Sequence, residues 1–283
     1  MKVLVGITTH NRADILAKSI QSALDQDYEN KQIAVFDDAS TDETKELRKK
    51  FPNVTWYRSE KTVGYLHARN QLMRETDADL FISLDDDAWF IKGDEVSIGV
   101  QTMRERPHVA ALAYDILSPD RPNIKARSGP RTTHTFIGCG HLLRLSKIKE
   151  IGFYIPNPGF YGGEEQDLSI RLLDHGCELL ILPGVHVWHE KTLQARDLTK
   201  QHLSAVCNDL AFAVRRSPAS SLFWLLPGKI LSHTRFALMN NYLLPCLKGF
   251  YMFFSALPRL FSTREAVSKA AFHEYRRRMR LMV

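Results

Sequence analysis

The sequence predicts an α/β protein with a mostly parallel sheet flanked by helices and a helical C-terminal extension. Three observations lead to this prediction. Through the first two-thirds of the 283 residues, short apolar runs alternate with segments of helical periodicity, as in repeated strand–helix units. Acidic and polar clusters follow several of these runs, at the positions where doubly wound sheets bind ligands. The remaining third is basic and rich in Phe, Leu, Trp and Tyr.

The first strand–helix pair is expected close to the N-terminus. Residues 3–7 form a continuous apolar run and are predicted to be a buried strand. Asn11 is placed to be the N-cap of a helix over residues 12–24, whose apolar residues recur on one side. Thr8 and Asn11 therefore lie in the turn that joins the strand to its helix. Because the sequence turns polar at Thr8, no signal peptide is expected.

The second strand is predicted at residues 33–36 and leads directly into Asp37 and Asp38. Ser40 and Glu43 have the spacing of a capping box, so a second helix is expected to begin there. The two carboxylates thus occupy the same kind of strand-to-helix turn as Thr8 does.

An acidic triplet follows the fourth predicted strand. Residues 54–57 and 80–84 are predicted strands with a helix over 66–74 between them, and three aspartates at 85–87 come next. Adjacent carboxylates raise one another's pKa, and a hard divalent cation held by oxygen ligands would relieve that cost. The alternative interpretation is a solvated acidic turn.

The fold logic places the polar clusters after the first, second and fourth strands on one rim of the sheet, because parallel strands end at the same edge. This coincidence favours a binding site over a solvated turn. The sequence has no Gly-x-Gly-x-x-Gly after the first strand and no Gly-Lys-Ser/Thr loop. These absences disfavour a dinucleotide-binding dehydrogenase and a P-loop NTPase.

A second acidic centre begins a later helix. Residues 164–175 predict a helix that Gly176 ends, and Glu164 and Glu165 fall in its first turn. The preceding pair Gly162-Gly163 allows the backbone to bend close to a ligand. One interpretation is that first-turn acids only stabilise the helix, by roughly 0.3–1 kcal/mol each. The other is that one of them is a general base.

Three histidines and a cysteine are weaker candidates. His186 and His189 follow an apolar run, and a lone histidine is more often a hydrogen-bonding structural residue than a metal ligand. Cys139 and His141 have ligand-type side chains, but one thiol and one imidazole do not make a metal site. We therefore expect Cys139 to belong to an ordinary strand or loop.

Bulk composition describes a globular protein with an unusual charge distribution. Hydrophobic residues make up 44% and charged residues 25%, and the four cysteines are widely spaced. That spacing argues against a disulfide framework and a zinc site, and it fits a reducing cytosol. Residues 1–197 hold 25 basic and 29 acidic side chains, whereas residues 198–283 hold 13 and 3. We expect a catalytic domain over 1–197 and a basic, apolar helical extension over 198–283.

The extension has two competing interpretations. Proline and charged residues interrupt its apolar runs, so no stretch reaches the length expected of a membrane span. Helices lying on an anionic membrane surface suit the basic and aromatic composition. A helical subdomain packed on the catalytic core is the alternative. Nucleic-acid binding is not expected, because no recognised binding motif accompanies the charge.

Several motifs, in order, resemble those of family 2 glycosyltransferases, which have the GT-A fold. The matching segments are VGITTHNR at 5–12, FDDASTD at 36–42, GYLHARN at 64–70, LDDD at 84–87 and GGEEQDL at 162–168, followed by Arg171 and His189. Each segment alone is only moderately specific, but their order is specific. The similarity extends to the enzymes of bacterial surface-polysaccharide assembly, rhamnosyltransferases included.

The resemblance implies a nucleotide-diphospho-sugar donor, a divalent cation (Mn²⁺ or Mg²⁺) and inversion at the anomeric carbon. For the nucleotide, it implies that Asp38 bonds the base and that Thr8 and Asn11 lie near it. Arg69 is implied to lie near the donor phosphates, and Asp86 is assigned to the nucleotide-sugar site as a spacer.

The resemblance also implies the metal ligands and the base. Asp87 should be the direct metal ligand, Asp85 should meet the ribose or the metal shell, and His189 matches a late histidine that adds a metal contact in some relatives. The family usually has Glu-Asp in the helix, and counting back from Arg171 places its catalytic base on Glu165. Since Glu replaces Asp here, Glu164 remains the alternative.

We therefore expect an inverting, metal-dependent glycosyltransferase that acts on a glycan or lipid-linked acceptor in cell-surface polysaccharide or glycolipid biosynthesis. It is expected to be cytoplasmic, at the inner face of the cytoplasmic membrane, with the membrane surface as a partner. Two alternatives differ in class: a metal-dependent nucleotidyltransferase, and a non-catalytic sugar-nucleotide-binding scaffold at the membrane. The first would usually carry a glycine-rich basic loop after its first strand, and retention of both acidic centres argues against the second.

Overall fold

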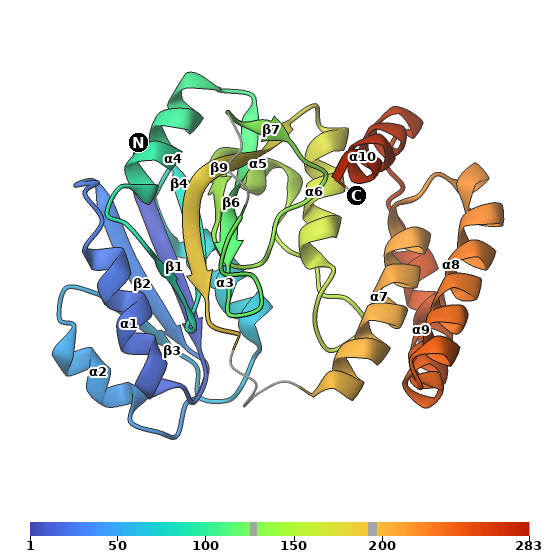
Figure 1. Cartoon of the computed structure of the whole chain (residues 1–283), viewed down its shortest axis with the longest axis horizontal. Helices are drawn as coiled ribbons and strands as arrows, with labels where there is room; N and C mark the ends of the chain where they lie inside the picture. Colours follow the sequence, from blue (N-terminus) through green and yellow to red (C-terminus); the bar gives the residue numbers. More distant parts are fainter. Residues whose placement is uncertain (125–128, 192–196, 283) are drawn as a thin grey trace. The chain divides into compact units, whose positions relative to one another are not determined.

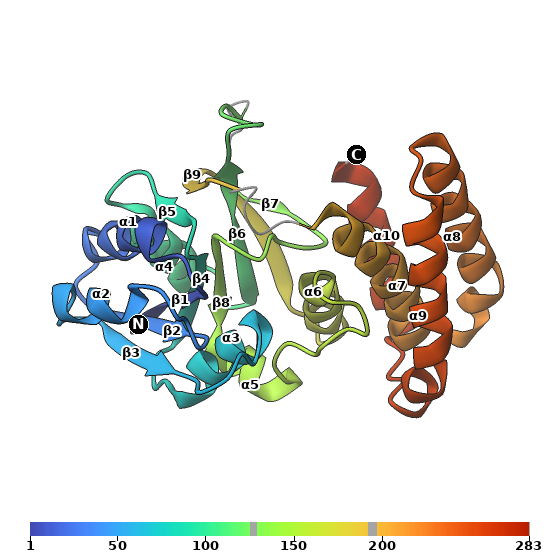
Figure 2. The same cartoon turned by 90° about the horizontal axis from the view of Figure 1, so that it is seen from below.

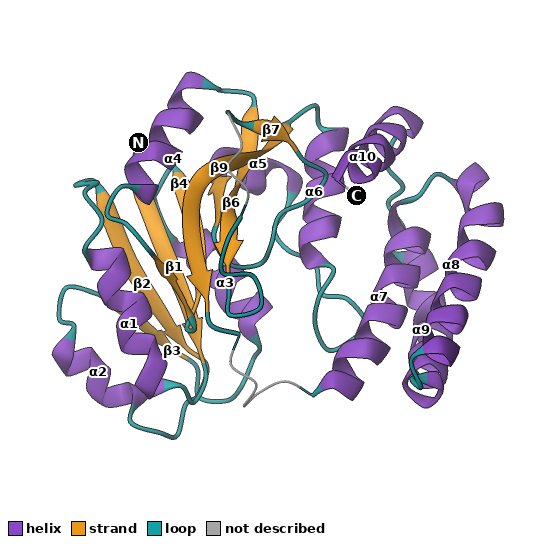
Figure 3. Cartoon of the chain, in the orientation of Figure 1, coloured by secondary structure: helices purple, strands orange, loops and turns teal. Residues whose placement is uncertain are grey.

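The fold comes from a computed structural model that describes residues 1–124, 129–191 and 197–282. The chain divides into two compact units, Met1–Phe153 with Gly176–Thr192 and Tyr154–His175 with Leu193–Val283. The first unit contains the sheet and the second contains only helices among the residues described, as the colouring by secondary structure shows (Figure 3).

The secondary structure alternates in the first unit and becomes helical in the second (Figure 1). The strands are β1 (Val3–Thr9), β2 (Lys31–Asp37), β3 (Thr55–Arg58), β4 (Leu80–Asp85), β5 (Ala88–Phe90), β6 (Val109–Leu117), β7 (Arg131–Thr132), β8 (His141–Arg144) and β9 (Glu178–His189). The helices are α1 (Ala13–Leu24), α2 (Thr44–Lys50), α3 (Tyr65–Glu75), α4 (Glu95–Glu105), α5 (Leu145–Ile151), α6 (Glu164–Asp174), α7 (Leu198–Arg216), α8 (Ala219–Met239), α9 (Leu243–Ser262) and α10 (Lys269–Met282).

The sheet has the order β3-β2-β1-β4-β8-β6-β9-β5, with β7 paired to β9. Its first four strands are parallel, as predicted for repeated strand–helix units. Its second half is mixed, because β8 runs antiparallel to both β4 and β6 while β6 and β9 are parallel. The predicted α/β class is confirmed, and the first four predicted strands are confirmed as β1 to β4 with small shifts at their ends.

Helices cover both faces of the sheet, with α1 and α4 on one side and α3 and α5 on the other (Figure 2). Alternate residues of the strands, such as Val5 and Ile82, pack with Leu16 of α1 and Val100 of α4 in the main apolar core. The opposite face needs a glycine at position 6, because a Cβ there would lie 2.5 Å from the Phe81 ring. The close approach of β1 to its neighbours therefore depends on this residue.

Both predicted helix caps are wrong in the same way. Asn11 has φ 54° and does not cap α1, and neither Ser40 nor Glu43 caps α2 through its side chain. Instead Asp42 accepts hydrogen bonds from the backbone N–H of Ala13 at 3.0 Å and of Thr44 at 3.0 Å. One carboxylate thus satisfies free N–H groups at the start of both helices, where negative charge is also favoured.

The second unit has its own core. Leu210 of α7, Ala237 of α8 and Phe253 of α9 are buried together in an apolar cluster. Next to it, the fully buried Asp167 of α6 pairs with Arg171 at 2.9 Å and with Arg216 of α7 at 2.7 Å. This ion-pair network ties α6 to the C-terminal helices.

The division into units differs from the predicted border at residue 197. Residues 154–175, which include α6, group with the C-terminal helices because α6 packs against α7 and α10. The border of the catalytic domain at 197 stays a prediction. Across the described parts of the chain, no helix combines the length and the apolar character needed to cross a membrane.

Candidate functional site

The predicted nucleotide-binding residues meet at the ends of β1, β2 and β4. Thr8 of β1 is the register partner of Asp85 of β4, and Thr9 of β1 is the partner of Asp37 of β2. Because side chains alternate along a strand, Thr8 and Asp85 project from the face that α3 covers, as Gly6 does. The prediction that these strand ends share one rim is confirmed.

Asp38 is held in place by the loop that precedes α3. Its Oδ1 accepts hydrogen bonds from the Ser59 hydroxyl at 2.9 Å and the Val63 N–H at 2.7 Å, and its Oδ2 accepts one from the Gly64 N–H at 2.8 Å. The side chain is almost fully buried. Both lone pairs of Oδ1 are therefore used, whereas Oδ2 has one left that can accept from another donor.

Asn11 connects the turns that follow β1 and β2. Its side-chain oxygen accepts hydrogen bonds from the Thr41 N–H at 2.7 Å and the Thr41 hydroxyl at 3.2 Å. Its backbone N–H donates to the Ser40 hydroxyl at 2.9 Å. The left-handed conformation of Asn11 is thereby fixed by contacts on both sides, which gives the rim a defined shape.

Two arginines balance the charge of the acidic triplet. Arg69 of α3 is buried, forms an ion pair with Asp85, and lies with its guanidinium 5.0 Å from the centre of the Tyr65 ring. Arg12 lies 2.6 Å from Asp86 and 3.2 Å from Asp87. The triplet is therefore a compensated cluster, and the interpretation as a solvated acidic turn is wrong, because Asp86 and Asp87 are buried.

Asp86 has a strongly altered acidity. The pKa of Asp86 is raised to about 6, mainly because the side chain is buried. The Arg12 guanidinium opposes this shift, and the negative charges of Asp85 and Asp87 add a smaller upward effect. Its carboxylate points to Arg12. The structure places Asp86 in this ion pair. A role of Asp86 in nucleotide-sugar binding stays a prediction.

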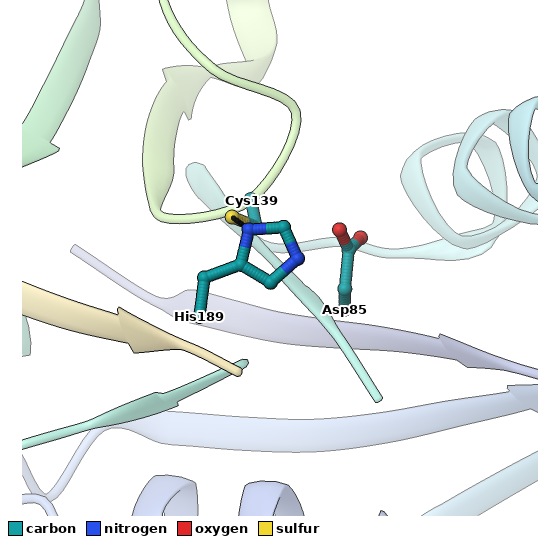
Figure 4. Close-up of side chains that lie close together, drawn as sticks. All are labelled: Asp85, Cys139 and His189. Carbon is teal, nitrogen blue, oxygen red and sulfur yellow. Dashed lines mark hydrogen bonds between the residues drawn. The ribbon is translucent and has the colours of Figure 1, made fainter. Parts of the chain in front are cut away.

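Asp87 and His189 lie together, and Cys139 joins them. The His189 Nε2 is 3.2 Å from an Asp87 oxygen, and its Nδ1 is 3.4 Å from the Cys139 sulfur. The imidazole lies between the Cys139 sulfur and the Asp85 carboxylate (Figure 4). Ligand atoms of Asp85, Cys139 and His189 are within 4.8 Å of one another.

Cys139 was missed by the sequence analysis, which expected an ordinary strand or loop position. It is separated from His189 by 50 residues, and only the placement of β8 beside β4 brings it to the rim. No local pattern signals that pairing. Its neighbour His141 is fully buried and contacts the Ile137 carbonyl at 2.8 Å, so His141 is a packing residue.

The donor set at this rim fits a divalent cation. Carboxylate oxygens from Asp85 and Asp87 are the ligands that Mg²⁺ and Mn²⁺ prefer, and the His189 imidazole suits Mn²⁺ better than Mg²⁺. Burial and the charges of Asp85 and Asp87 raise the pKa of the Cys139 thiol well above its usual range. In the absence of a cation Cys139 is therefore a neutral thiol.

Glu165 belongs to the second unit and lies in the first turn of α6. Gly162 and Gly163 have φ 93° and 86°, so both adopt the left-handed region that the predicted bend requires. The loop before the helix is held by Asn208 of α7, whose side chain accepts from the Gly159 N–H at 2.7 Å and donates to the Gly162 carbonyl at 2.8 Å. Glu164 is buried, whereas Glu165 is half-buried.

The profile of glycosyl transferase family 2 matches residues 4–158, which is more than half of the chain. The chain belongs to this family. It is accordingly a glycosyltransferase with the GT-A fold. The match covers β1 to β4 with the acidic triplet, and it ends before α6. A comparison with curated protein sequences finds no match.

Solved structures of glycosyltransferases share the fold at low identity. TarS (residues 1–349) of S. aureus is 14% identical, with a TM-score of 0.64 over 93% of this chain and 83% of that chain. A mannosyltransferase of Pyrobaculum calidifontis, in complex with GDP-Man and Mn²⁺, is 16% identical, with a TM-score of 0.62 over 99% and 80%. GalNAc-T7 with UDP, GalNAc and Mn²⁺ is 16% identical, with a TM-score of 0.60 over 83% and 54%.

Proposed function

We propose that this glycosyltransferase moves a sugar from a nucleotide-diphospho-sugar to an acceptor hydroxyl, with the help of a divalent cation and with inversion at the anomeric carbon. The single observation that supports the proposal most is the cluster of Asp85, Asp87 and His189 at the strand-end rim, compensated by Arg12 and Arg69. Carboxylates and cationic side chains together are the groups that a metal-bound diphosphate requires.

The donor half of the proposal rests on the first unit. Asp38 bonds the nucleotide base, Thr8 and Asn11 border the nucleoside, and Arg69 lies near the diphosphate. The buried, preorganised position of Asp38 supports its role, because its carboxylate needs no rearrangement to accept one more hydrogen bond. The nucleotides recorded with two of the similar structures, GDP-Man and UDP, support a donor of this class.

A divalent cation, Mn²⁺ or Mg²⁺, is held by Asp87 and His189, with Asp85 at the ribose or in the metal shell. When bound, it supplies Lewis-acid stabilisation of the negative charge that develops on the leaving diphosphate. Mn²⁺ is present in two of the similar structures. Asp86 orients Arg12 toward Asp87 through its ion pair, and it thereby borders the nucleotide-sugar.

Glu165 is the general base. In the proposed step the acceptor oxygen attacks the anomeric carbon while the bond from that carbon to the diphosphate oxygen breaks. The acceptor proton passes to the Glu165 carboxylate, and the electron pair leaves with the nucleoside diphosphate. The half-buried position of Glu165 supports this choice over the buried Glu164, because a base must reach a substrate.

The acceptor is a glycan or a lipid-linked glycan of the cell surface, and the enzyme works in the cytoplasm at the inner face of the cytoplasmic membrane. The C-terminal helices support this part, because residues 198–283 hold 13 basic and 3 acidic side chains. No nucleic acid is part of the proposal.

Two substitutions test the two acidic centres separately. We expect Asp87→Ala and Glu165→Gln each to reduce sugar transfer by roughly 100-fold or more, since one weakens metal-diphosphate binding and the other removes the base. Only Asp87→Ala should also weaken Mn²⁺-dependent donor binding. Transfer is measured with a panel of UDP-, GDP- and dTDP-sugars, and binding is measured by isothermal titration.

Glu164→Gln and Glu105→Gln are the matched controls. Glu105 is an exposed acid of α4, so its variant should keep normal transfer. Normal turnover in Glu165→Gln together with a loss in Glu164→Gln would reassign the base to Glu164. Equal donor binding with and without Mn²⁺ in the unsubstituted protein would reject the metal.

A further inference from the structure

Helices α8 and α9 each expose a stripe of large apolar side chains. On α8 the stripe consists of Trp224, Leu231 and Leu238, and on α9 of Leu244, Tyr251 and Phe254. Each of the six is between 48% and 77% exposed. Within a stripe the residues are spaced by seven or three positions, so they fall on one side of their helix. We refer to the two stripes together as the docking face.

A different side of each helix is already used for folding. Ala237 of α8 and Cys246, Phe253 and Leu260 of α9 are buried in the core that α7 completes. Figures 1 and 2 show α8 and α9 beside α7 in both views. The docking face therefore points away from that core, and folding of this unit does not cover it. Soluble monomeric proteins rarely expose apolar patches of this kind unless a partner binds there.

The charges of α8 and α9 restrict the choice of partner. From Ala219 to Ser262 the sequence has four cationic residues, Lys229, Arg235, Lys248 and Arg259, and no Asp or Glu. Arg235 and Lys248 are exposed within the same two helices as the stripes. A symmetric dimer through this face would place it against itself, and its cations would then face cations. A partner with an apolar interior and an anionic surface meets both requirements.

We propose that the docking face binds the surface of an anionic lipid bilayer. The stripes enter the boundary between the head groups and the acyl chains, while Arg235 and Lys248 meet lipid phosphates. Trp224 and Tyr251 have the apolar ring and polar edge that favour this boundary. No described helix could cross the membrane, so the helices lie along its surface. The proposal deepens the membrane-side part of the proposed function and identifies the residues that carry it.

A cavity beside the docking face has the same chemistry. It has a volume of about 310 Å³ and lies among α7, α8 and α10, with Trp224 of the docking face in its wall. Its walls are mainly apolar, from residues such as Leu225 and Phe272. Two cationic side chains also line it, Arg276 and Lys229, of which Lys229 forms an ion pair with Asp209 of α7. An apolar cavity with cationic groups suits part of a lipid with an anionic head group. This supports a lipid surface as the partner.

Vesicle flotation of the full chain tests the proposal without donor or acceptor. The probes are vesicles of pure phosphatidylcholine and of phosphatidylcholine mixed with phosphatidylglycerol. We expect the protein to float with the anionic vesicles, to bind the neutral ones far more weakly, and to dissociate from the anionic ones at high salt.

The decisive variant is Leu231→Glu/Leu244→Glu, and its matched control is Ile91→Glu/Leu198→Glu. Both pairs replace two exposed aliphatic side chains with glutamates, so they change the net charge equally, but only the first lies on the docking face. We expect at least roughly tenfold weaker partitioning for the first pair and little change for the second. Circular dichroism and a thermal melt establish that each variant is folded.

A second pair keeps the test valid if the glutamate variant does not fold. Arg235→Gln/Lys248→Gln should weaken binding to anionic vesicles roughly tenfold, whereas the exposed control Lys49→Gln/Lys147→Gln should not.

The proposal is overturned if the unsubstituted chain does not float with anionic vesicles, or if docking-face and control variants partition alike. If the unsubstituted chain does not float but forms a dimer, and Leu231→Glu/Leu244→Glu dissociates that dimer, the docking face binds a second copy of the chain. A chain that transfers sugar but does not float would reject the docking face alone.

Discussion

Asp86 illustrates how position decides what a single carboxylate contributes. It lies between two acids and is buried, and burial raises its pKa to about 6 despite the ion pair with Arg12. Because the pKa in the folded state exceeds the usual value of 3.8, the folded protein binds this proton more tightly than the unfolded chain does. The stabilisation that Asp86 contributes is therefore present below pH 3.8 and is lost as the pH rises through about 6.

Substitutions at Asp86 test this energetic argument. We expect Asp86→Asn to increase the free energy of unfolding of the metal-free protein at neutral pH by about 1–3 kcal/mol. Asparagine removes the disfavoured charge and keeps an oxygen that accepts a hydrogen bond from Arg12. Asp86→Leu should have the opposite effect, because it leaves the guanidinium without that acceptor. Chemical denaturation measures both variants, and a loss of stability in Asp86→Asn would contradict the argument.

His141 should make the protein sensitive to acid. It is fully buried, and burial lowers its pKa to about 3, with the nearby positive charge of Arg69 acting in the same direction. Its pKa in the folded state is below the ordinary value of 6.5, so the unfolded chain binds the proton more readily. Stability is thus complete above pH 6.5 and is lost as the pH falls toward 3, by about 2 kcal/mol at pH 5.

The measurement compares unfolding of the unsubstituted protein and His141→Gln as a function of pH. Glutamine retains an N–H donor for the Ile137 carbonyl and has no charge to gain, so the difference between the two proteins isolates this histidine. That difference separates His141 from Asp86, whose effect has the opposite sign in an overlapping pH range. An equal pH dependence of the two proteins would show that His141 binds its proton as readily in the folded protein as in the unfolded chain, and it would contradict the prediction.

At the level of elements, the loop before α6 is the part of the second unit most directly linked to the proposed base. Asn208 contacts Gly159, Tyr161 and Gly162 through one side chain. A Cβ at residue 159 would lie 2.6 Å from the Asn208 oxygen, so this pair fits only with glycine. Asn208 is therefore a positioning residue for Glu165, which follows the loop in the first turn of α6.

Asn208→Leu should separate positioning from donor binding. We expect the turnover number to fall roughly tenfold or more, since a small displacement of a general base is costly. Donor affinity should not change, because every proposed donor contact lies in the first unit. Steady-state kinetics and donor titration provide the two readouts, and Asn240→Leu, at the exposed C-cap of α8, is a matched control. Weaker donor binding in Asn208→Leu would contradict the assignment.

The same scale shows which elements the sequence could predict. Apolar runs and periodicity are local signals, so β1 to β4 and helices α1, α3 and α6 could be placed from them. The helix caps could not be predicted, because Asp42 caps α1 from 29 residues further along the chain. Sequence patterns for capping contain only residues close to the start of the helix. The order of the strands beyond β4 depends on long-range pairing, so it could not be predicted from local sequence patterns either. Cys139 could not be predicted as part of the metal-ligand cluster, because its place there depends on this long-range pairing.

At the level of the whole molecule, each of the two units has a hydrophobic core among the described residues, and these cores need not unfold together. One core lies under the sheet and the other is formed by α7, α8 and α9. Every proposed ligand of the donor and the cation is in the first unit, whereas Glu165 is in the second. Ligands should therefore stabilise the units unequally.

Calorimetry with and without donor and Mn²⁺ tests this expectation. We expect two transitions, of which only one moves to higher temperature, with a gain of about 2.7 kcal/mol at a ligand concentration 100 times Kd. Asp87→Ala should abolish the shift and leave the second transition where it is. A single transition that shifts as a whole would show that the units unfold as one.

The placement of residues 154–175 has a consequence for protein engineering. One way to exchange acceptor preference between related transferases is to swap a contiguous C-terminal segment. Here such a swap at residue 197 would separate α6 from α7, and it would break the Asp167–Arg216 pair at a fully buried position. A chimera should instead be built as a discontinuous graft that takes 154–175 together with the C-terminal helices and leaves 176–191 with the recipient's sheet.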